Sequence, residues 1–213
     1  MPLDPEFLDT AALAATRHPG SQVMLCPRPG DPMGIGPFGS FAEWQQFVLQ
    51  FDLPAAIPQI VTRKFERALK LYVLAWIDID LMNVGCLVAL TTLELALKDR
   101  YGDKVPKSDL SLARLVQYMV EDDGLADELL PMAANNDWAI VAALYETDDA
   151  RKKRKGTGVM PPLTIAEIRN MAAHGYPFDG LPRGGLLELV RDLILYAYRD
   201  MIAELYALGG LGA

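Results

Sequence analysis

The chain has 213 residues, 51% of them hydrophobic; this composition excludes an intrinsically disordered protein and can bury a sizeable core. Its formal net charge of −8 argues against non-specific coating of DNA or of an anionic membrane, because both attract a basic face. The first residues lack the basic start and apolar run of a signal peptide. The most apolar stretch, residues 81–97, is short for a membrane span. We therefore expect a soluble, cytoplasmic protein.

Residues that carry common cofactor chemistry are scarce in this chain. Its two histidines, His18 and His174, and its two cysteines, Cys26 and Cys86, form no metal-ligand cluster. The cysteines are predicted to be thiols in a reducing cytosol, and a disulfide between them is the alternative. The chain has no phosphate-binding loop, nucleophile elbow or dinucleotide fingerprint in a suitable context. We predict neither a metal nor a cofactor.

The first 40 residues differ in composition from the rest. Residues 4–16 suit one helix, and residues 17–39 hold five prolines and five glycines, which predicts a loop. We expect residues 1–40 to form an arm that packs on the domain or on a partner.

Helical patterns fill the remainder of the chain. Ser40 and Glu43 form a capping box before a helix that reaches about residue 51. A further helix is predicted from residue 58, with a kink or restart at residues 78–80, and an apolar helix follows at 81–101. Others are predicted at 110–121 after a cap at Ser108 or Asp109, at 125–134 with an interruption at Pro131, from Asp137 over 138–145 or on toward residue 154, and at 186–208.

No alternating strand pattern persists in the sequence. We therefore predict an all-α protein, with an antiparallel helical bundle over residues 41–208 and a flexible tail over residues 209–213.

One short predicted helix carries the candidate site. Thr164 and Glu167 form a capping box at its start, and Gly175 ends it. His174 lies at its C-terminal end, where the helix dipole favours a protonated imidazole.

This stretch resembles the HEPN superfamily, whose motif is an Arg, usually a polar residue, and a His after four to six intervening residues. Here the motif reads Arg169-Asn170-Met171-Ala172-Ala173-His174. The resemblance implies an antiparallel helical bundle with this motif before its last long helix. It also implies that active members cut RNA without a metal, and that two motifs pair across a homodimer.

Within that resemblance, each motif residue has a chemical role. His174 would serve as base or acid, since imidazole changes charge near neutral pH. Arg169 would fork onto two phosphate oxygens, and Asn170 would orient the phosphate or the ring. The alternative is structural: Arg169 pairs with a carboxylate, and His174 merely caps the helix carbonyls.

Helical geometry constrains this site. Positions five apart on a helix differ by about 140° around the axis, so Arg169 and His174 of one chain should not touch. Either the helix ends before His174 or a second chain completes the site. Glu94 lies on a polar line with Asn83 and Thr91 along an apolar helix, and a buried carboxylate needs a partner. Arg169 is one candidate; the alternatives are another cation or exposure of that edge.

Five consecutive cations form the most basic run of the chain. They are Arg151, Lys152, Lys153, Arg154 and Lys155, close in sequence to the motif helix. They suit a landing site for RNA phosphates, and a solvated helix end is the alternative.

Two functional hypotheses follow from this pattern. The first is a metal-independent endoribonuclease of HEPN type, a toxin or defence component that cuts RNA in a dimeric cleft and has an antitoxin protein as a partner. The second is a catalytically silent HEPN-like helical module for dimerisation or RNA binding. Neither hypothesis involves a membrane or DNA.

Overall fold

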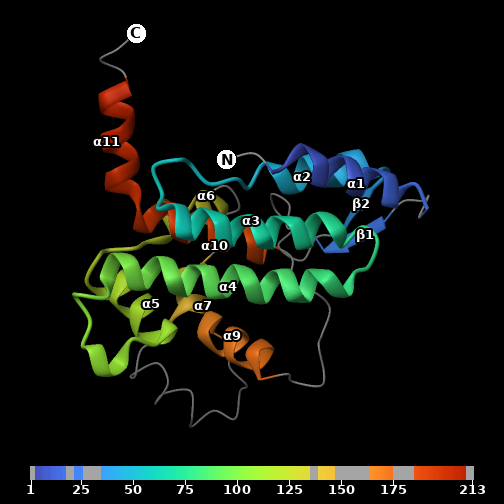
Figure 1. The fold of residues 1–213 in the computed structure, drawn as a ribbon. Coiled ribbons are helices and arrows are strands. Elements are labelled where there is room, and N and C mark those ends of the chain that lie inside the picture. The colour runs from blue at the N-terminus through green and yellow to red at the C-terminus, as the bar shows by residue number, and fades with distance from the viewer. Residues whose placement is uncertain are drawn as a thin grey trace, which may run out of the picture.

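The computed structural model describes residues 3–17, 22–25, 35–134, 139–146, 164–174 and 185–209, and it is all-α apart from one small hairpin (Figure 1). The longer helices are α1 (Pro5–Ala15), α2 (Phe41–Leu49), α3 (Gln59–Leu74), α4 (Asp80–Tyr101), α5 (Leu112–Glu121), α9 (Ile165–Ala173), α10 (Leu186–Ala197) and α11 (Arg199–Gly209). The single-turn helices are α6 (Pro131–Ala134) and α7 (Val141–Leu144), and the 3-10 turns are Lys107–Asp109 and Asp127–Leu129.

Helix α4 is the centre of the bundle. Helices α3, α10, α5 and α9 all pack against it, and Figure 1 shows α3 and α9 on its two sides. Ala89, Leu90 and Leu93 are fully buried along it, as its apolar pattern predicts. By length and hydropathy alone α4 is also able to cross a membrane, a test that the core helix of a soluble protein passes as well.

Helices α3 and α4 approach closely at Gly85. A Cβ atom at this position would lie 2.7 Å from Cδ2 of Tyr72, so only glycine fits here without displacing the ring. The Tyr72 hydroxyl lies 3.0 Å from Sγ of Cys86, and the Tyr72 carbonyl accepts a 2.8 Å hydrogen bond from Nε1 of Trp44. This cluster joins α2, α3 and α4.

The predicted loop over residues 17–39 contains a β-hairpin, which corrects that prediction. Strands β1 (Gln22–Leu25) and β2 (Ile35–Phe38) are antiparallel, with Val23 opposite Pro37. Four-residue strands are too short to show alternation, and a two-stranded sheet tolerates a proline that donates no ladder hydrogen bond. Phe38, at the end of β2, packs against an aromatic side chain of α2: its ring centroid lies 5.0 Å from that of Trp44.

Several predicted helix limits are confirmed, and others are wrong. Ser40 caps α2 by accepting from the Glu43 amide, as predicted, but the predicted capping box is incomplete, because the Glu43 side chain accepts from the Gly39 amide instead of the Ser40 amide. Ser111 caps α5, because Lys107–Asp109 forms a separate 3-10 turn ahead of it. Pro131 begins α6 instead of interrupting a longer helix. Proline suits this position, because an amide proton in the first turn of a helix has no acceptor within the helix.

The single helix predicted over residues 186–208 is broken at Tyr198. This residue has φ −104° and ψ 14°, its ring is fully buried, and its hydroxyl donates to Oδ2 of Asp99 at 2.7 Å. Turning Tyr198 into the core ends α10, whose last carbonyl, on Ala197, accepts from Nε of Arg100 at 2.9 Å. Helix α11 then projects from the bundle, with Leu205 48% exposed and Tyr206 69% exposed (Figure 1).

The contact at Gly85 generates a stability prediction. Gly85→Val should lower the free energy of unfolding by about 3 kcal/mol, the upper end for overpacking, because the new side chain meets the buried Tyr72 ring. Gly39→Ala is the matched control, since its Cβ would approach nothing closer than 3.4 Å. Chemical denaturation of both variants measures the difference, and equal stabilities would contradict the proposed close approach.

Candidate functional site

Helix α9 positions the motif residues. Its capping box forms as predicted: Oγ1 of Thr164 accepts from the Glu167 amide at 3.3 Å, and Oε2 of Glu167 accepts from the Thr164 amide at 2.8 Å. Ile165 and Ala166 are buried, and the helix packs on α4, α5 and α7. The N-terminal half of α9 is therefore anchored, and its C-terminal end faces outward.

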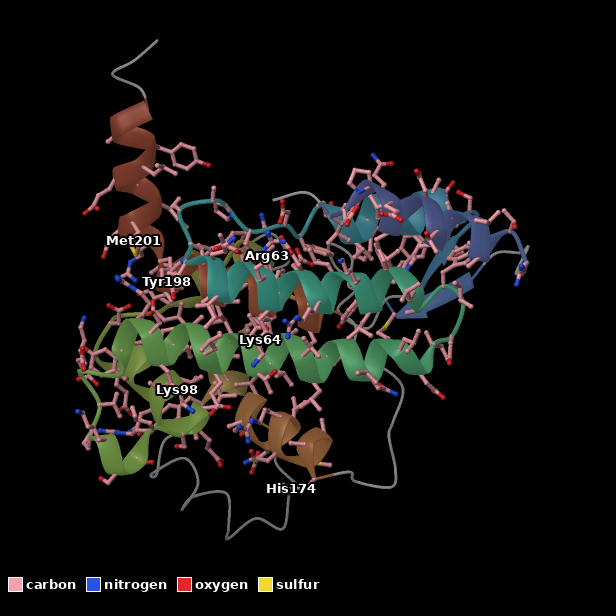
Figure 2. The ribbon with its side chains drawn as sticks, in the orientation of Figure 1. Arg63, Lys64, Lys98, His174, Tyr198 and Met201 are labelled. Atoms are coloured by element: carbon pink, nitrogen blue, oxygen red, sulfur yellow. The ribbon has the colours of Figure 1, made fainter. Side chains whose placement is uncertain are left out.

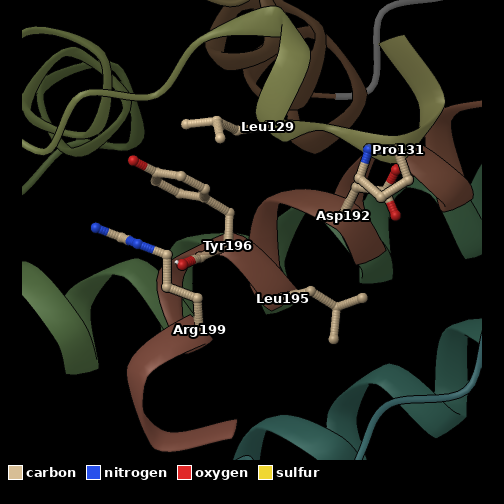
Figure 3. A pocket seen from close by; sticks show the side chains of 6 residues that line it. All are labelled: Leu129, Pro131, Asp192, Leu195, Tyr196 and Arg199. Carbon is tan, nitrogen blue, oxygen red and sulfur yellow. Dashed lines mark hydrogen bonds between the residues drawn. The ribbon is translucent and has the colours of Figure 1, made fainter. Parts of the chain in front are cut away.

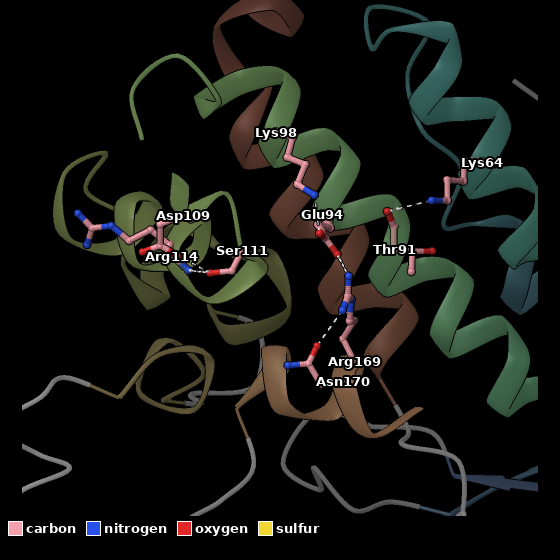
Figure 4. Close-up of polar contacts among 9 residues, drawn as sticks. All are labelled: Lys64, Thr91, Glu94, Lys98, Asp109, Ser111, Arg114, Arg169 and Asn170. Atoms are coloured by element: carbon pink, nitrogen blue, oxygen red, sulfur yellow. Dashed lines mark hydrogen bonds and ion pairs between the residues drawn. The ribbon is translucent and has the colours of Figure 1, made fainter. Parts of the chain in front are cut away.

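The structure brings Arg169 and Glu94 together. The Arg169 guanidinium donates from Nη2 to Oε2 of Glu94, and Lys98 donates from Nζ to Oε1 at 2.6 Å (Figure 4). The Glu94 side chain is 11% exposed and the Arg169 side chain 28%. The sequence left open whether Glu94 pairs with Arg169 or with another cation. In the structure both pairings form on the same carboxylate.

The two cations control the ionisation of Glu94. Burial by itself raises the pKa of this carboxyl, but the hydrogen bonds and positive charges of Lys98 and Arg169 together outweigh burial. The pKa of Glu94 therefore lies below its usual value, and the carboxylate stays ionised at neutral pH.

Asn170 and His174 lie on the outward side of α9. Oδ1 of Asn170 accepts from Nη1 of Arg169 at 2.8 Å, so the amide orients the guanidinium within one chain. His174 is the C-cap, with φ −91° and ψ 7°, and its amide donates to the Asn170 carbonyl at 3.0 Å. Its side chain is exposed at the end of α9 (Figure 2), and no described residue hydrogen-bonds to its imidazole.

The structure therefore separates the two motif residues. Arg169 points toward α4, whereas His174 lies at the free end of α9 (Figures 2 and 4). No hydrogen bond joins them within the described chain, in agreement with the offset of about 140° between positions five apart.

Other predicted features lie outside the described residues. These are the basic run Arg151–Lys155, the proposed cap Asp137, the helix-ending Gly175, and the residues His18 and Cys26. They stay predictions.

Lys64 is a site residue that the sequence did not indicate. Its ammonium on α3 donates to the Thr91 carbonyl on α4 at 3.2 Å. Burial lowers the pKa of Lys64; Glu94 opposes this, and the charges of Arg67, Lys98 and Arg169 lower the pKa further. Only the packing of α3 on α4 brings Lys64 here, so no local pattern signals it. The Lys98–Glu94 pair, by contrast, follows from an i, i+4 spacing.

A second polar cluster joins the end of α5 to the junction of α10 and α11. Arg199 donates to both oxygens of Asp123, at 2.8 and 3.1 Å, and lies 4.1 Å from the ring centroid of Tyr196. A mostly apolar cavity of about 270 Å³ adjoins it (Figure 3), lined by Leu129, Pro131, Asp192, Leu195, Tyr196 and Arg199.

The protein itself satisfies the charged groups of this cavity. Oδ2 of Asp192 accepts from the Met132 amide at 2.8 Å, and Arg191 lies 3.2 Å from its other oxygen. Burial raises the pKa of Asp192 despite these partners. The cluster is therefore structural, and within the described residues no three His, Cys, Asp or Glu side chains group as a metal site would require.

Comparison of the chain with family models, with curated proteins and with solved structures finds no match. The HEPN resemblance thus stays a prediction that rests on the motif residues and their helix.

The depressed pKa of Glu94 predicts a pH-dependent stability. A carboxyl with a lowered folded pKa contributes stability above its unfolded value, near 4.5, and loses it as the pH falls through the folded pKa. Glu94→Gln should therefore lower the free energy of unfolding at pH 7 by about 1–3 kcal/mol, because the neutral amide offers one acceptor oxygen to two cations and no charge to pair with them.

The gap between Glu94→Gln and wild type should narrow below pH 4.5. Urea denaturation from pH 3 to pH 7 measures it. Glu204→Gln, an exposed carboxylate on α11, is the matched control and should leave the curve unchanged. A gap that is constant with pH would contradict the role of the Glu94 charge.

Proposed function

We propose that the protein is a metal-independent endoribonuclease of HEPN type, acting through Arg169 and His174. One observation carries the proposal. Helix α9 bears the exposed imidazole of His174 at its C-terminal end, and it also bears Arg169, which Glu94 anchors beside a second cation, Lys98. As a toxin or defence component, such an enzyme would be held inactive by an antitoxin protein.

The arrangement of Arg169 suits a phosphate. Nη2 bonds Glu94 and Nη1 bonds Asn170, so each terminal nitrogen keeps a second proton that no described residue accepts. Its Nε is buried with no hydrogen-bond partner among the described residues, an arrangement that costs stability. Glu94 and Asn170 thus preorganise the guanidinium toward the charge that gathers on phosphorus.

His174 supplies the proton transfers. The imidazole takes the proton of the RNA 2′-hydroxyl, and the 2′ oxygen attacks phosphorus to form a 2′,3′-cyclic phosphate. The bond from phosphorus to the 5′ oxygen breaks, and the imidazolium returns the proton to that leaving oxygen. Because His174 is exposed and no described residue hydrogen-bonds to its ring, it is available for both steps.

A homodimer would complete the site. Glu167, Asn170, Ala173 and His174 form an exposed side of α9, and a two-fold axis beside them would place Arg169 of one copy near His174 of the other. Helix α10 buries its apolar face on α4, and α11 lies away from α9 (Figure 1), so neither helix adds apolar surface beside the motif.

One observation favours the second candidate, a catalytically silent module for dimerisation or RNA binding. Within one chain Arg169 is engaged by Glu94 and Asn170, as a purely structural arginine would be. Activity decides between the two candidates.

The cleavage test uses single-stranded RNA in EDTA. The wild type should leave a 2′,3′-cyclic phosphate, and His174→Ala should lower the rate at least 100-fold, the contribution typical of a general acid–base. The fold should persist, because His174 is exposed. Exposed Asn170→Ala should lower the rate less. Undiminished cleavage by His174→Ala, or a strict magnesium requirement, would sink the assignment.

The dimer is tested by mixing Arg169→Ala and His174→Ala chains. If each site takes Arg169 and His174 from opposite copies, a mixed dimer keeps one intact site, and random exchange should restore about a quarter of wild-type activity. Each mutant alone is the control. A wild type that sediments as a monomer at micromolar concentration and still cuts RNA would end the shared-site proposal while leaving the roles of Arg169 and His174 intact.

A further inference from the structure

Four cations from three helices meet along one part of α4. Lys64 and Arg67 belong to α3, Lys98 to α4 and Arg169 to α9. Figure 4 shows Lys64 and Arg169 reaching α4 from the neighbouring helices α3 and α9, while Lys98 extends from α4 itself to Glu94. These three helices are neighbours in the fold, so the grouping is built by the central packing of the bundle.

Hydrogen bonds fix the cations along the helix axis. Lys64 is held at the Thr91 carbonyl at 3.2 Å, Arg169 at Glu94, and Lys98 at the same carboxylate at 2.6 Å. Thr91 and Glu94 lie about 4.5 Å apart along the axis, and Lys98 and Arg169 meet at Glu94. Helix α3 runs antiparallel to α4, since Lys64 meets Thr91 and Tyr72 meets Cys86, so Arg67 lies one turn of α3 beyond Lys64, away from Glu94. The positive charges are therefore spread in a row along the two helices from Arg67 through Lys64 to the pair at Glu94.

The row carries a surplus of positive charge in an acidic protein. Among the charges that shift the pKa of Lys64 are one carboxylate, Glu94, and three cations, Arg67, Lys98 and Arg169. Arg67 and Lys98 are exposed, and Lys64 and Arg169 are half-buried, so an approaching ligand can reach the row. With a net charge of −8 on the chain, such a surplus marks this face for a polyanion.

The surface beside the cations is partly apolar. Leu95 is half-buried between Thr91 and Lys98, and half-buried Val88 and exposed Val84 continue the same side of α4 ahead of Thr91 by helical spacing. A strip of cations beside apolar side chains suits a single-stranded nucleic acid, whose phosphates need charge and whose unstacked bases need apolar contact.

We propose that Lys64, Arg67 and Lys98 extend the Arg169 site into a binding track for the phosphate backbone of single-stranded RNA. This inference rests on the proposed ribonuclease function for the identity of its ligand, and it assigns the substrate-binding residues of that same site. Lys64 and Arg67 hold flanking phosphates, and Lys98 also keeps Glu94 in place.

The test measures binding of a fluorescein-labelled 12-nucleotide oligouridylate as a function of salt. All variants carry His174→Ala, so binding is read without cleavage. The parent should lose affinity steeply with salt, and Lys64→Gln/Arg67→Gln should flatten the slope of log affinity against log salt by about 0.7 for each lost phosphate contact. Lys64→Arg/Arg67→Lys, which keeps both charges, should restore the slope.

The matched control removes two exposed cations elsewhere, Arg17 after α1 and Lys107 in the 3-10 turn, as Arg17→Gln/Lys107→Gln. It has the same net charge as the test variant and should keep the parental slope. Thermal unfolding of each variant verifies the fold. An equal slope in test and control variants, or a parent that binds no oligouridylate, would overturn the proposal.

Two competitors identify the ligand class. Unlabelled oligouridylate should displace the probe, whereas inorganic phosphate or polyglutamate at equal anion concentration should displace it at least tenfold less effectively. Displacement by polyglutamate as effective as by RNA would assign the row to an acidic protein instead and overturn the proposal.

If the slopes behave as expected and the wild type cuts no RNA, the track stands and the ribonuclease fails. If the wild type cuts RNA and the slopes are unchanged, the ribonuclease stands and the track fails.

Discussion

A carboxylate on the buried central helix is the constraint on which the site depends. Glu94 belongs to a helix packed on several sides, where an unpaired charge would be strongly unfavourable. Lys98 compensates from one turn along α4, and Arg169 compensates from α9. The ion pair with Arg169 is therefore a specific link between the motif helix and the core, alongside the apolar contacts of Ile165 and Ala166.

This link has a consequence for the motif. Because Glu94 and Asn170 each accept a hydrogen bond from Arg169, few rotamers of the Arg169 side chain keep both bonds. The remaining protons of its guanidinium are therefore fixed in direction. His174 has the opposite setting, at an exposed helix end. For the proposed acid–base chemistry on a phosphate, a fixed cation and an accessible imidazole are complementary requirements, and α9 carries an anchored arginine and an exposed histidine.

Local signals in the sequence predicted several helices and helix ends of this fold, because such signals act within a few residues. The helix cap at Ser40, the capping box at Thr164 and the apolar character of α4 are patterns of that kind. The β-hairpin was not predicted because it depends on pairing between two short segments that are separated in the sequence by residues rich in proline and glycine. The end of α10 was not predicted because Tyr198 turns inward to reach Asp99, far away in sequence, although the apolar periodicity continues past it.

The same distinction applies to the site. The sequence named Glu94 as a buried carboxylate in need of a partner and gave Arg169 as one candidate, but only the packing of α9 on α4 selects this pair from the chain's twelve arginines and eight lysines. Lys64 had no local signal at all, because its acceptor is a backbone carbonyl of another helix. A cation row built from three helices is a property of how they pack, so it arises only where α3 and α9 flank α4. This is also why the row and the motif adjoin: the contact that neutralises Glu94 brings Arg169 to the same stretch of helix that Lys64 reaches from the opposite side.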